Sequence, residues 1–151
     1  MSNRALPRDL GRILDFMGVL WSVNHGLESR SKRMAAIHGV TGPQRLVVRI
    51  VGRRPGIAAG ELAEVLRVHP STLTGIVRRL VERRLIERRG DPGDRRRALF
   101  TLTVRGRRID RLRAGTVEGA ISKALHRFGA DDIRRAKELL AAIAGTLDEP
   151  T

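Results

Sequence analysis

The order of patterns between residues 61 and 102 constrains the fold of this chain more than any other feature. A short helix is predicted at 61–66, and three turn residues separate it from Pro70, which suits the first position of a helix. Apolar residues then recur at steps of three and four, so a second helix is predicted from Pro70 to about Arg84. Its inward stripe consists of Leu73, Ile76, Val77 and Leu80.

A β-hairpin is predicted directly after this second helix. Two short segments with apolar residues, 85–89 and 98–102, flank a run of Gly, Asp, Pro and Arg at 90–97. The tip of the hairpin is therefore long and basic. A short helix, a turn, a second helix and a basic hairpin, in this order, form the pattern of a winged helix-turn-helix.

The outward face of the second helix has the chemistry that a DNA major groove requires. This groove is about 12 Å wide and is read at the base edges, so a helix that enters it must carry small or hydrogen-bonding side chains in front. Hydroxyl groups begin this face, and two arginines follow in a better position for phosphates than for bases. These residues are Ser71, Thr72, Thr74, Arg78 and Arg79. The alternative for the hydroxyl groups is that they cap the helix.

Three consecutive arginines, Arg95, Arg96 and Arg97, stand at the predicted hairpin tip. Guanidinium groups at such a tip can enter a minor groove, where narrow A·T-rich DNA has an enhanced negative potential. The alternative is a solvated patch of charge.

The net charge of +14 is concentrated in the middle of the chain. Residues 41–113 hold 19 cations and seven anions (+12), whereas residues 1–40 carry +3 and residues 114–151 carry −1. Arginine makes up 27 of the 30 cations, so genomic base composition is an alternative source of the charge. A uniform codon bias would spread arginine evenly, and the gradient therefore favours an anion-binding surface in the middle segment.

Several function classes are disfavoured. The chain has no cysteine, which excludes disulfides, thiol sensing and cysteine-ligated metals. Its four histidines lack metal-ligand spacing, and there is no Gly-rich phosphate loop or nucleophile motif, so we expect no enzyme activity, cofactor or metal. No apolar stretch approaches the roughly 18 to 20 residues of a membrane span, and no signal peptide is recognised, so a soluble cytoplasmic protein is expected.

Helices are also predicted on both sides of the middle segment. The helix from Asp9 to about Ser29 is apolar on so many sides that a small domain cannot cover it alone. Thr41 is the predicted N-cap of a helix to about Gly52, with an inner face of Leu46, Val47 and Ile50.

Two further helices are predicted after the hairpin. Thr103 caps the first, at about 104–127, where Gly106, Gly115 and Gly119 should weaken or bend it. The last begins near Asp131 and needs other helices to pack against, because its apolar pattern covers only two heptads. That pattern consists of Ile133, Ala136, Leu140, Ile143 and Leu147.

The stretch 41–103 resembles the MarR family of bacterial transcriptional regulators. The resemblance lies in His-Pro-Ser-Thr-Leu-Thr at 69–74, Leu-Val-Glu-Arg-Arg-Leu-Ile at 80–86 and Asp-Pro-Gly-Asp-Arg-Arg-Arg at 91–97. The Asp-Arg-Arg that leads through a strand to Leu-Thr-x-x-Gly at 102–106 is its most family-specific part. Two departures are Arg97, where many members have a small residue, and the run 58–60, which lacks the usual Ser or Thr cap.

The resemblance implies an α+β fold, mainly α with a small β-hairpin wing. A winged helix-turn-helix lobe would occupy 41–103, and residues 1–40 and 104–151 would form a helical dimerisation region. The protein would act as a homodimer, as a repressor on a pseudo-palindromic operator in double-stranded DNA. Pro70, Ser71 and Thr74 match positions that approach bases, Arg96 matches the wing arginine that enters the minor groove, and Asp94 matches the carboxylate that holds it.

Members of the family often bind small aromatic or anionic effectors between the dimerisation helices and the winged lobe. Four residues are candidates here, because a tryptophan stacks on a ring and cations pair with a carboxylate. They are Trp21, His25, His38 and Arg45. The alternative is that they are core, surface or interface residues.

The main alternative function is a nonspecific architectural DNA-binding protein. RNA and single-strand binding are disfavoured because those modules stack bases on exposed aromatic side chains, and aromatic residues make up only 3% of this chain.

Overall fold

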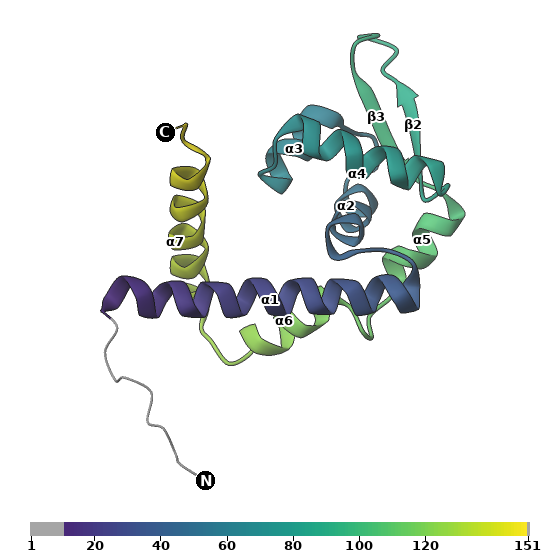
Figure 1. Ribbon diagram of the computed structural model, residues 1–151. Helices are drawn as coiled ribbons and strands as arrows, with labels where there is room; N and C mark the ends of the chain where they lie inside the picture. The colour runs from purple at the N-terminus through teal and green to yellow at the C-terminus, as the bar shows by residue number, and fades with distance from the viewer. Residues whose placement is uncertain (1–10, 151) are drawn as a thin grey trace. The chain divides into compact units, whose positions relative to one another are not determined.

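The computed structural model describes residues 11–150, which form seven α-helices and one three-stranded antiparallel sheet. The expected class, mainly α with a small hairpin wing, is confirmed (Figure 1). The chain divides into two compact units, residues 1–116 and 117–151. Asp9 and Leu10, where the first helix is expected to begin, lie outside the described residues.

Helix α1 (Arg12–His38) is longer than predicted. The polar run after Ser29 continues the helix, because it contains no glycine or proline before Gly39. Gly39 ends the helix in the left-handed conformation (φ 74°), and its N–H donates to the Ala35 carbonyl oxygen at 2.8 Å. Met34 is the one fully buried residue of α1, so most of the apolar side chains of this helix are exposed.

Helix α2 (Gly42–Arg53) begins at the predicted cap. The Thr41 hydroxyl accepts the Gln44 N–H at 3.4 Å, and the Gln44 side chain accepts the Thr41 N–H at 3.1 Å, which makes a capping box. The predicted inner face is partly wrong, because Leu46 is 49% exposed. The core contacts centre on Val47, Val48 and Val51, with Ile50 partly buried.

Helices α3 (Ala59–Leu66) and α4 (Pro70–Glu82) form the predicted helix-turn-helix. The inward stripe of α4 is confirmed: Leu73, Val77 and Leu80 are buried and Ile76 is partly buried.

Both helices end in the same motif, with an arginine in the left-handed conformation where glycine is usual. The two arginines are Arg67 (φ 54°) and Arg84 (φ 55°). In each motif the next N–H reaches the carbonyl oxygen five residues earlier, at 3.2 Å for Val68 and 2.9 Å for Leu85. These Schellman-type ends fix the direction in which the chain leaves each helix.

The wing is the hairpin of β2 (Ile86–Gly90) and β3 (Ala98–Leu102), within one residue of the predicted bounds. It projects beyond the helices of its unit in Figure 1. A third strand, β1 (Ile57–Ala58), pairs with β3 and was not predicted, because two residues show no alternation in the sequence. The core packs between this sheet and helices α2 to α4, and it includes Val48, Leu62, Leu80 and Phe100.

The single helix predicted at 104–127 is wrong. Helix α5 (Val104–Arg111) has Leu112 as its C-cap, and α6 (Val117–Leu125) begins five residues after this cap. Gly115 lies between them at φ 72°, a conformation that continues neither helix. The predicted cap is confirmed, because the Thr103 hydroxyl accepts the Gly106 N–H at 2.9 Å.

The second unit consists of α6 and α7 (Ala130–Asp148), which begins one residue before its predicted start. Neither helix has a fully buried residue. Leu139, Leu140 and Leu147 of α7 are each at least half exposed.

Candidate nucleic-acid interface

Helix α4 starts with a histidine cap. The His69 Nδ1 accepts the Ser71 N–H at 3.2 Å and lies 2.7 Å from the Ser71 hydroxyl oxygen. Pro70 follows at the first helical position, where its missing N–H costs no hydrogen bond. Neither of these two residues is buried, so the cap leaves the start of α4 open to a ligand.

The other predicted residues of α4 share an exposed face. Thr72, Thr74, Arg78 and Arg79 are all exposed. The Thr74 hydroxyl donates to the Pro70 carbonyl oxygen at 2.9 Å, which leaves the acceptor lone pairs of this exposed hydroxyl available. Arg78 forms an exposed pair with Glu82 at 3.8 Å, which is weak because both groups are solvated.

The wing tip is an ordered turn held by two aspartates. The Asp91 carboxylate accepts the Gly93 N–H and the Asp94 carboxylate accepts the Arg96 N–H, each at 2.9 Å. Asp94 therefore holds the main chain of Arg96.

The three wing arginines have different partners. Arg97 pairs with Glu61 of α3 at 3.4 Å and with Asp91 at 3.7 Å, which ties the base of the tip to the helix-turn-helix. Arg95 and Arg96 are exposed and form no ion pair within residues 11–150. Of the three tip arginines, these two are therefore the ones available to an anionic ligand.

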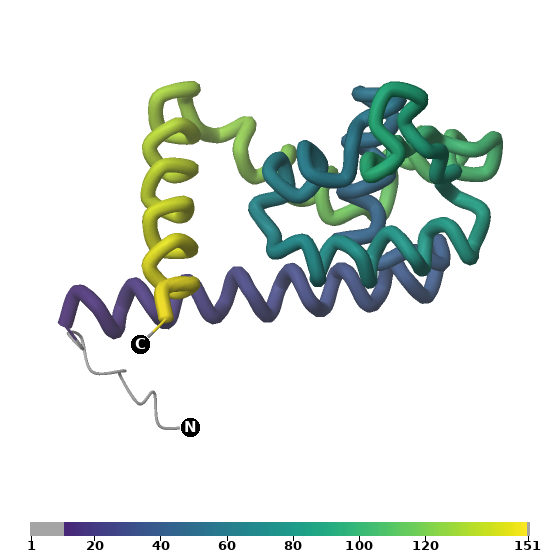
Figure 2. Tube along the Cα trace, turned by 90° about the horizontal axis from the view of Figure 1, so that it is seen from above, coloured from purple at the N-terminus to yellow at the C-terminus, as the bar shows by residue number. Residues whose placement is uncertain are grey.

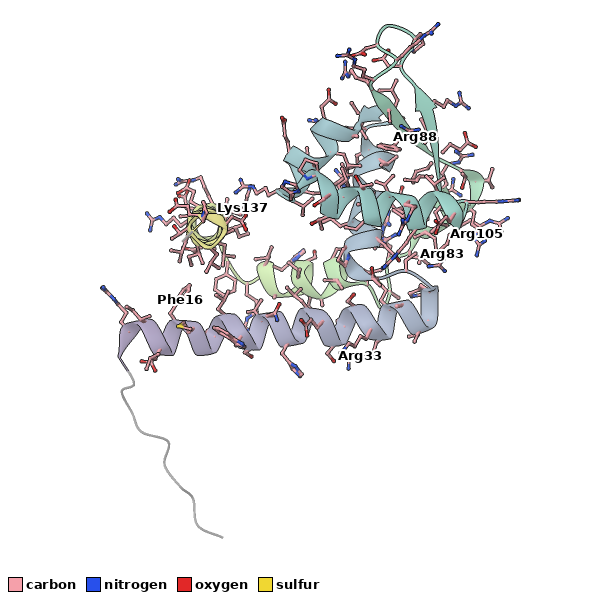
Figure 3. All side chains as sticks on the ribbon, turned by 45° about the horizontal axis from the view of Figure 1, so that its top comes forward. Phe16, Arg33, Arg83, Arg88, Arg105 and Lys137 are labelled. Atoms are coloured by element: carbon pink, nitrogen blue, oxygen red, sulfur yellow. The ribbon has the colours of Figure 1, made fainter. Side chains whose placement is uncertain are left out.

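A groove of about 540 Å³ lies between α4 and the wing. We call it the α4–wing groove. Its floor is apolar and includes Leu73, Val77 and Phe100. Arginines from three separate segments line it: Arg78 from α4, Arg88 from β2 and Arg96 from the tip. Figure 3 labels Arg88 on the strand.

Arg88 was not among the residues predicted from the sequence. Its position in a strand next to two other charged residues gives no sign of which way it faces. Only the pairing of β2 with β3, which sets Arg88 opposite Phe100, places it at the groove.

The four effector candidates are not brought together within one chain. Trp21 and His25 are exposed one turn apart on α1, and His38 is half-buried at the end of that helix. Trp21 and His38 are 17 residues apart in the helix, which corresponds to about 25 Å along a straight axis.

Arg45 is buried under α5. Its guanidinium donates to the carbonyl oxygens of Ile109 and Leu112, the latter at 2.6 Å. Nearby, Arg49 pairs with Asp110 at 2.7 Å. These contacts engage both terminal nitrogens of the Arg45 guanidinium, and they join α2 to the end of α5.

Neither a metal centre nor a membrane span is found in the described part of the chain. Within residues 11–150, His, Asp and Glu side chains do not gather in groups of three. None of the helices in this range contains the long apolar stretch that crossing a bilayer requires.

An exposed polar helix that follows a tight turn, beside a wing with available arginines, defines a winged helix-turn-helix DNA-binding protein. Residues 38–97 match the model of the MarR family. The chain is also similar to the HTH-type transcriptional repressor Rv2887 of Mycobacterium tuberculosis. The two sequences are 28% identical over 102 residues, and this alignment covers 68% of this chain and 73% of that protein.

Two solved structures show the same fold over most of the chain. The crystal structure of MarR has a TM-score of 0.65 and 26% identity, covering 95% of each chain. The DNA complex of Staphylococcus aureus MepR has a TM-score of 0.71 and 16% identity, covering 88% of this chain and 98% of that one. Over residues 38–97 the chain matches the MarR family, and these similarities identify it as a DNA-binding transcriptional regulator.

Proposed function

We propose that this protein is a repressor that binds a pseudo-palindromic operator as a homodimer. The observation that carries the proposal is the α4–wing groove, with arginines from α4, β2 and the tip on one concave surface. A recognition helix in the major groove and a wing in the adjacent minor groove leave one sugar–phosphate strand between them. The groove has the place and the charge to receive that strand, through Arg78, Arg88 and Arg96.

The exposed apolar surfaces of α1 and of the second unit support a homodimer. In α1 the exposed large side chains include Ile13, Val19 and Val23, and in the second unit they include Leu140 and Leu147. Monomeric proteins rarely expose this much apolar surface. We propose that a second copy of the chain covers both surfaces, because a two-fold dimer gives the two lobes that a palindrome requires.

We propose that a small aromatic or anionic effector releases the protein from DNA, with Trp21 and His25 as contact residues. Their exposure one turn apart on α1 supports this assignment. Trp21 is the only tryptophan in the chain, so its fluorescence reports binding at this place. Because bacterial operators lie in the cytoplasm, we propose that location for the protein.

The wing assignment predicts unequal effects of two neighbouring arginines. Arg96→Ala should weaken operator binding by about 1 to 3 kcal/mol and lower the salt slope of the affinity by about one, because a phosphate contact is lost. Arg97→Ala should weaken binding less, since Arg97 is paired with Glu61 and Asp91. The measurement is a binding titration at several salt concentrations.

Arg135→Ala on α7 is the matched control, because it removes the same charge from an exposed helix outside the lobe. If Arg96→Ala and Arg135→Ala have the same affinity and salt slope, the wing does not contact DNA and the proposal is wrong.

A further inference from the structure

One arginine joins the ends of two helices that lie far apart in the sequence. Arg83 is the C-cap residue of α4, and its guanidinium donates to the carbonyl oxygen of Gly39, the C-cap residue of α1. The side chain of Arg83 is half-buried, unlike the exposed Arg78 and Arg79 one turn earlier. Figure 3 labels Arg83 at this end of α4, and Figure 2 shows the whole length of α1.

Gly39 is fitted to this contact in two ways. Its φ of 74° is strained for any residue with a side chain. A Cβ at this position would also lie 2.7 Å from a guanidinium nitrogen of Arg83. The end of α1 therefore favours glycine for its left-handed turn, and a side chain there would displace the guanidinium of Arg83.

The contact also suits the charges at helix ends. The last carbonyl groups of a helix carry partial negative charge, and a cation at a helix C-terminus is stabilised by it. The guanidinium of Arg83 lies at the end of α1 while its main chain caps the end of α4. A single residue thus contacts two helix ends, with its guanidinium at α1 and its main chain at α4.

The corner between α1 and α2 is held at further points. The Gly42 N–H donates to the Ser31 hydroxyl oxygen at 2.7 Å, which attaches the start of α2 to the side of α1. Val40 is buried in the core of the lobe, and Thr41 forms the capping box of α2. The corner is fixed to α1. The hydrogen bond from Arg83 to Gly39 therefore couples the orientation of the end of α4 to that of α1.

We infer that Arg83 is a positioning residue that sets the angle of the recognition helix to α1, and through it the separation of the two recognition helices in the dimer. The inference rests on the proposed homodimer. Each copy of the dimer contains the contact once, so a change in angle at Arg83 is repeated in both lobes and changes the half-site spacing that the dimer fits. Arg83 acts through Gly39 and does not need to touch DNA.

The experiment uses a palindromic duplex selected in vitro by the wild-type full chain, and variants of it with one base pair inserted or removed at the centre. Each base pair changes the separation of the half-sites by about 3.4 Å and rotates them by about 35°. Arg83→Gln is compared with Arg79→Gln, which removes the same charge from the exposed face of the same helix. Affinities are measured at several salt concentrations, and thermal melting verifies that each variant folds.

The wild type should prefer its selected spacing by at least about 10-fold. Arg83→Gln should reduce this preference to within about 3-fold, weaken binding at the selected spacing several-fold and keep the wild-type salt slope. Arg79→Gln should keep the spacing preference and lower the salt slope by about one. Arg83→Lys retains one donor group for the Gly39 carbonyl and should fall between the wild type and Arg83→Gln.

Two outcomes overturn the inference: a spacing preference unchanged in Arg83→Gln, or a salt slope that falls by about one in this variant, which would make Arg83 a phosphate contact. If Arg83→Gln does not fold, the spacing preference is measured with Arg83→Lys instead. A wild-type spacing preference in that variant also overturns the inference. A wild type without any spacing preference contradicts the homodimer itself, which is a separate failure.

Discussion

Gly106→Ala should destabilise the winged lobe by at least about 3 kcal/mol. Gly106 is buried in the first turn of α5, and a Cβ there would lie 1.9 Å from the Leu85 carbonyl oxygen and 3.0 Å from its carbonyl carbon. Both atoms belong to the main chain at the start of the wing, so no side-chain rotation relieves the overlap. The free energy of unfolding is measured by denaturant titration.

Gly60→Ala in α3 is the matched control for this substitution. Nothing lies within 4 Å of a Cβ at Gly60, so alanine should stabilise the protein by about 0.5 to 1 kcal/mol through its higher helix propensity. The two substitutions are chemically identical and should have opposite signs. Equal effects at the two glycines would show that α5 does not pack against Leu85 as described.

Leu140→Asp should convert the dimer to monomers and reduce operator affinity by at least about 100-fold. Leu140 is half exposed on α7, and a two-fold interface would contain the new aspartate once from each copy, so two unpaired charges would be buried at once. Light scattering measures the mass in solution, and the same sample is titrated with operator.

Ala142→Asp is the control, since it adds the same charge two positions further along α7, on the opposite side of the helix. It should remain dimeric. A Leu140→Asp protein with the mass of a dimer would contradict the proposed interface. If Leu140→Asp is insoluble, Leu140→Ala replaces it and should raise the dimer dissociation constant at least 10-fold.

Features with local causes could be predicted from the sequence. The caps at Thr41 and Thr103 depend on residues within three positions, and both were predicted. The stripe of α4 was predicted because a helix with one buried face repeats its apolar residues at a fixed period.

Features set by distant contacts could not be predicted. The guanidinium of Arg45 binds carbonyl groups that lie more than 60 residues further along the chain, so nothing near it in the sequence indicates burial. The pairing of Arg97 with Glu61 also spans 36 residues, and it distinguishes Arg97 from Arg95 and Arg96, which look equivalent in the sequence. The groove position of Arg88 depends on strand register in the same way.

The central claim is that the two lobes of a dimer read a palindromic sequence. The most direct test compares the affinity of the wild-type protein for its selected palindrome with its affinity for a scrambled duplex of the same length and composition, at one fixed salt concentration. We predict that the palindrome binds at least about 1,000-fold more tightly. A ratio near one would contradict the claim and would instead identify a nonspecific architectural DNA-binding protein.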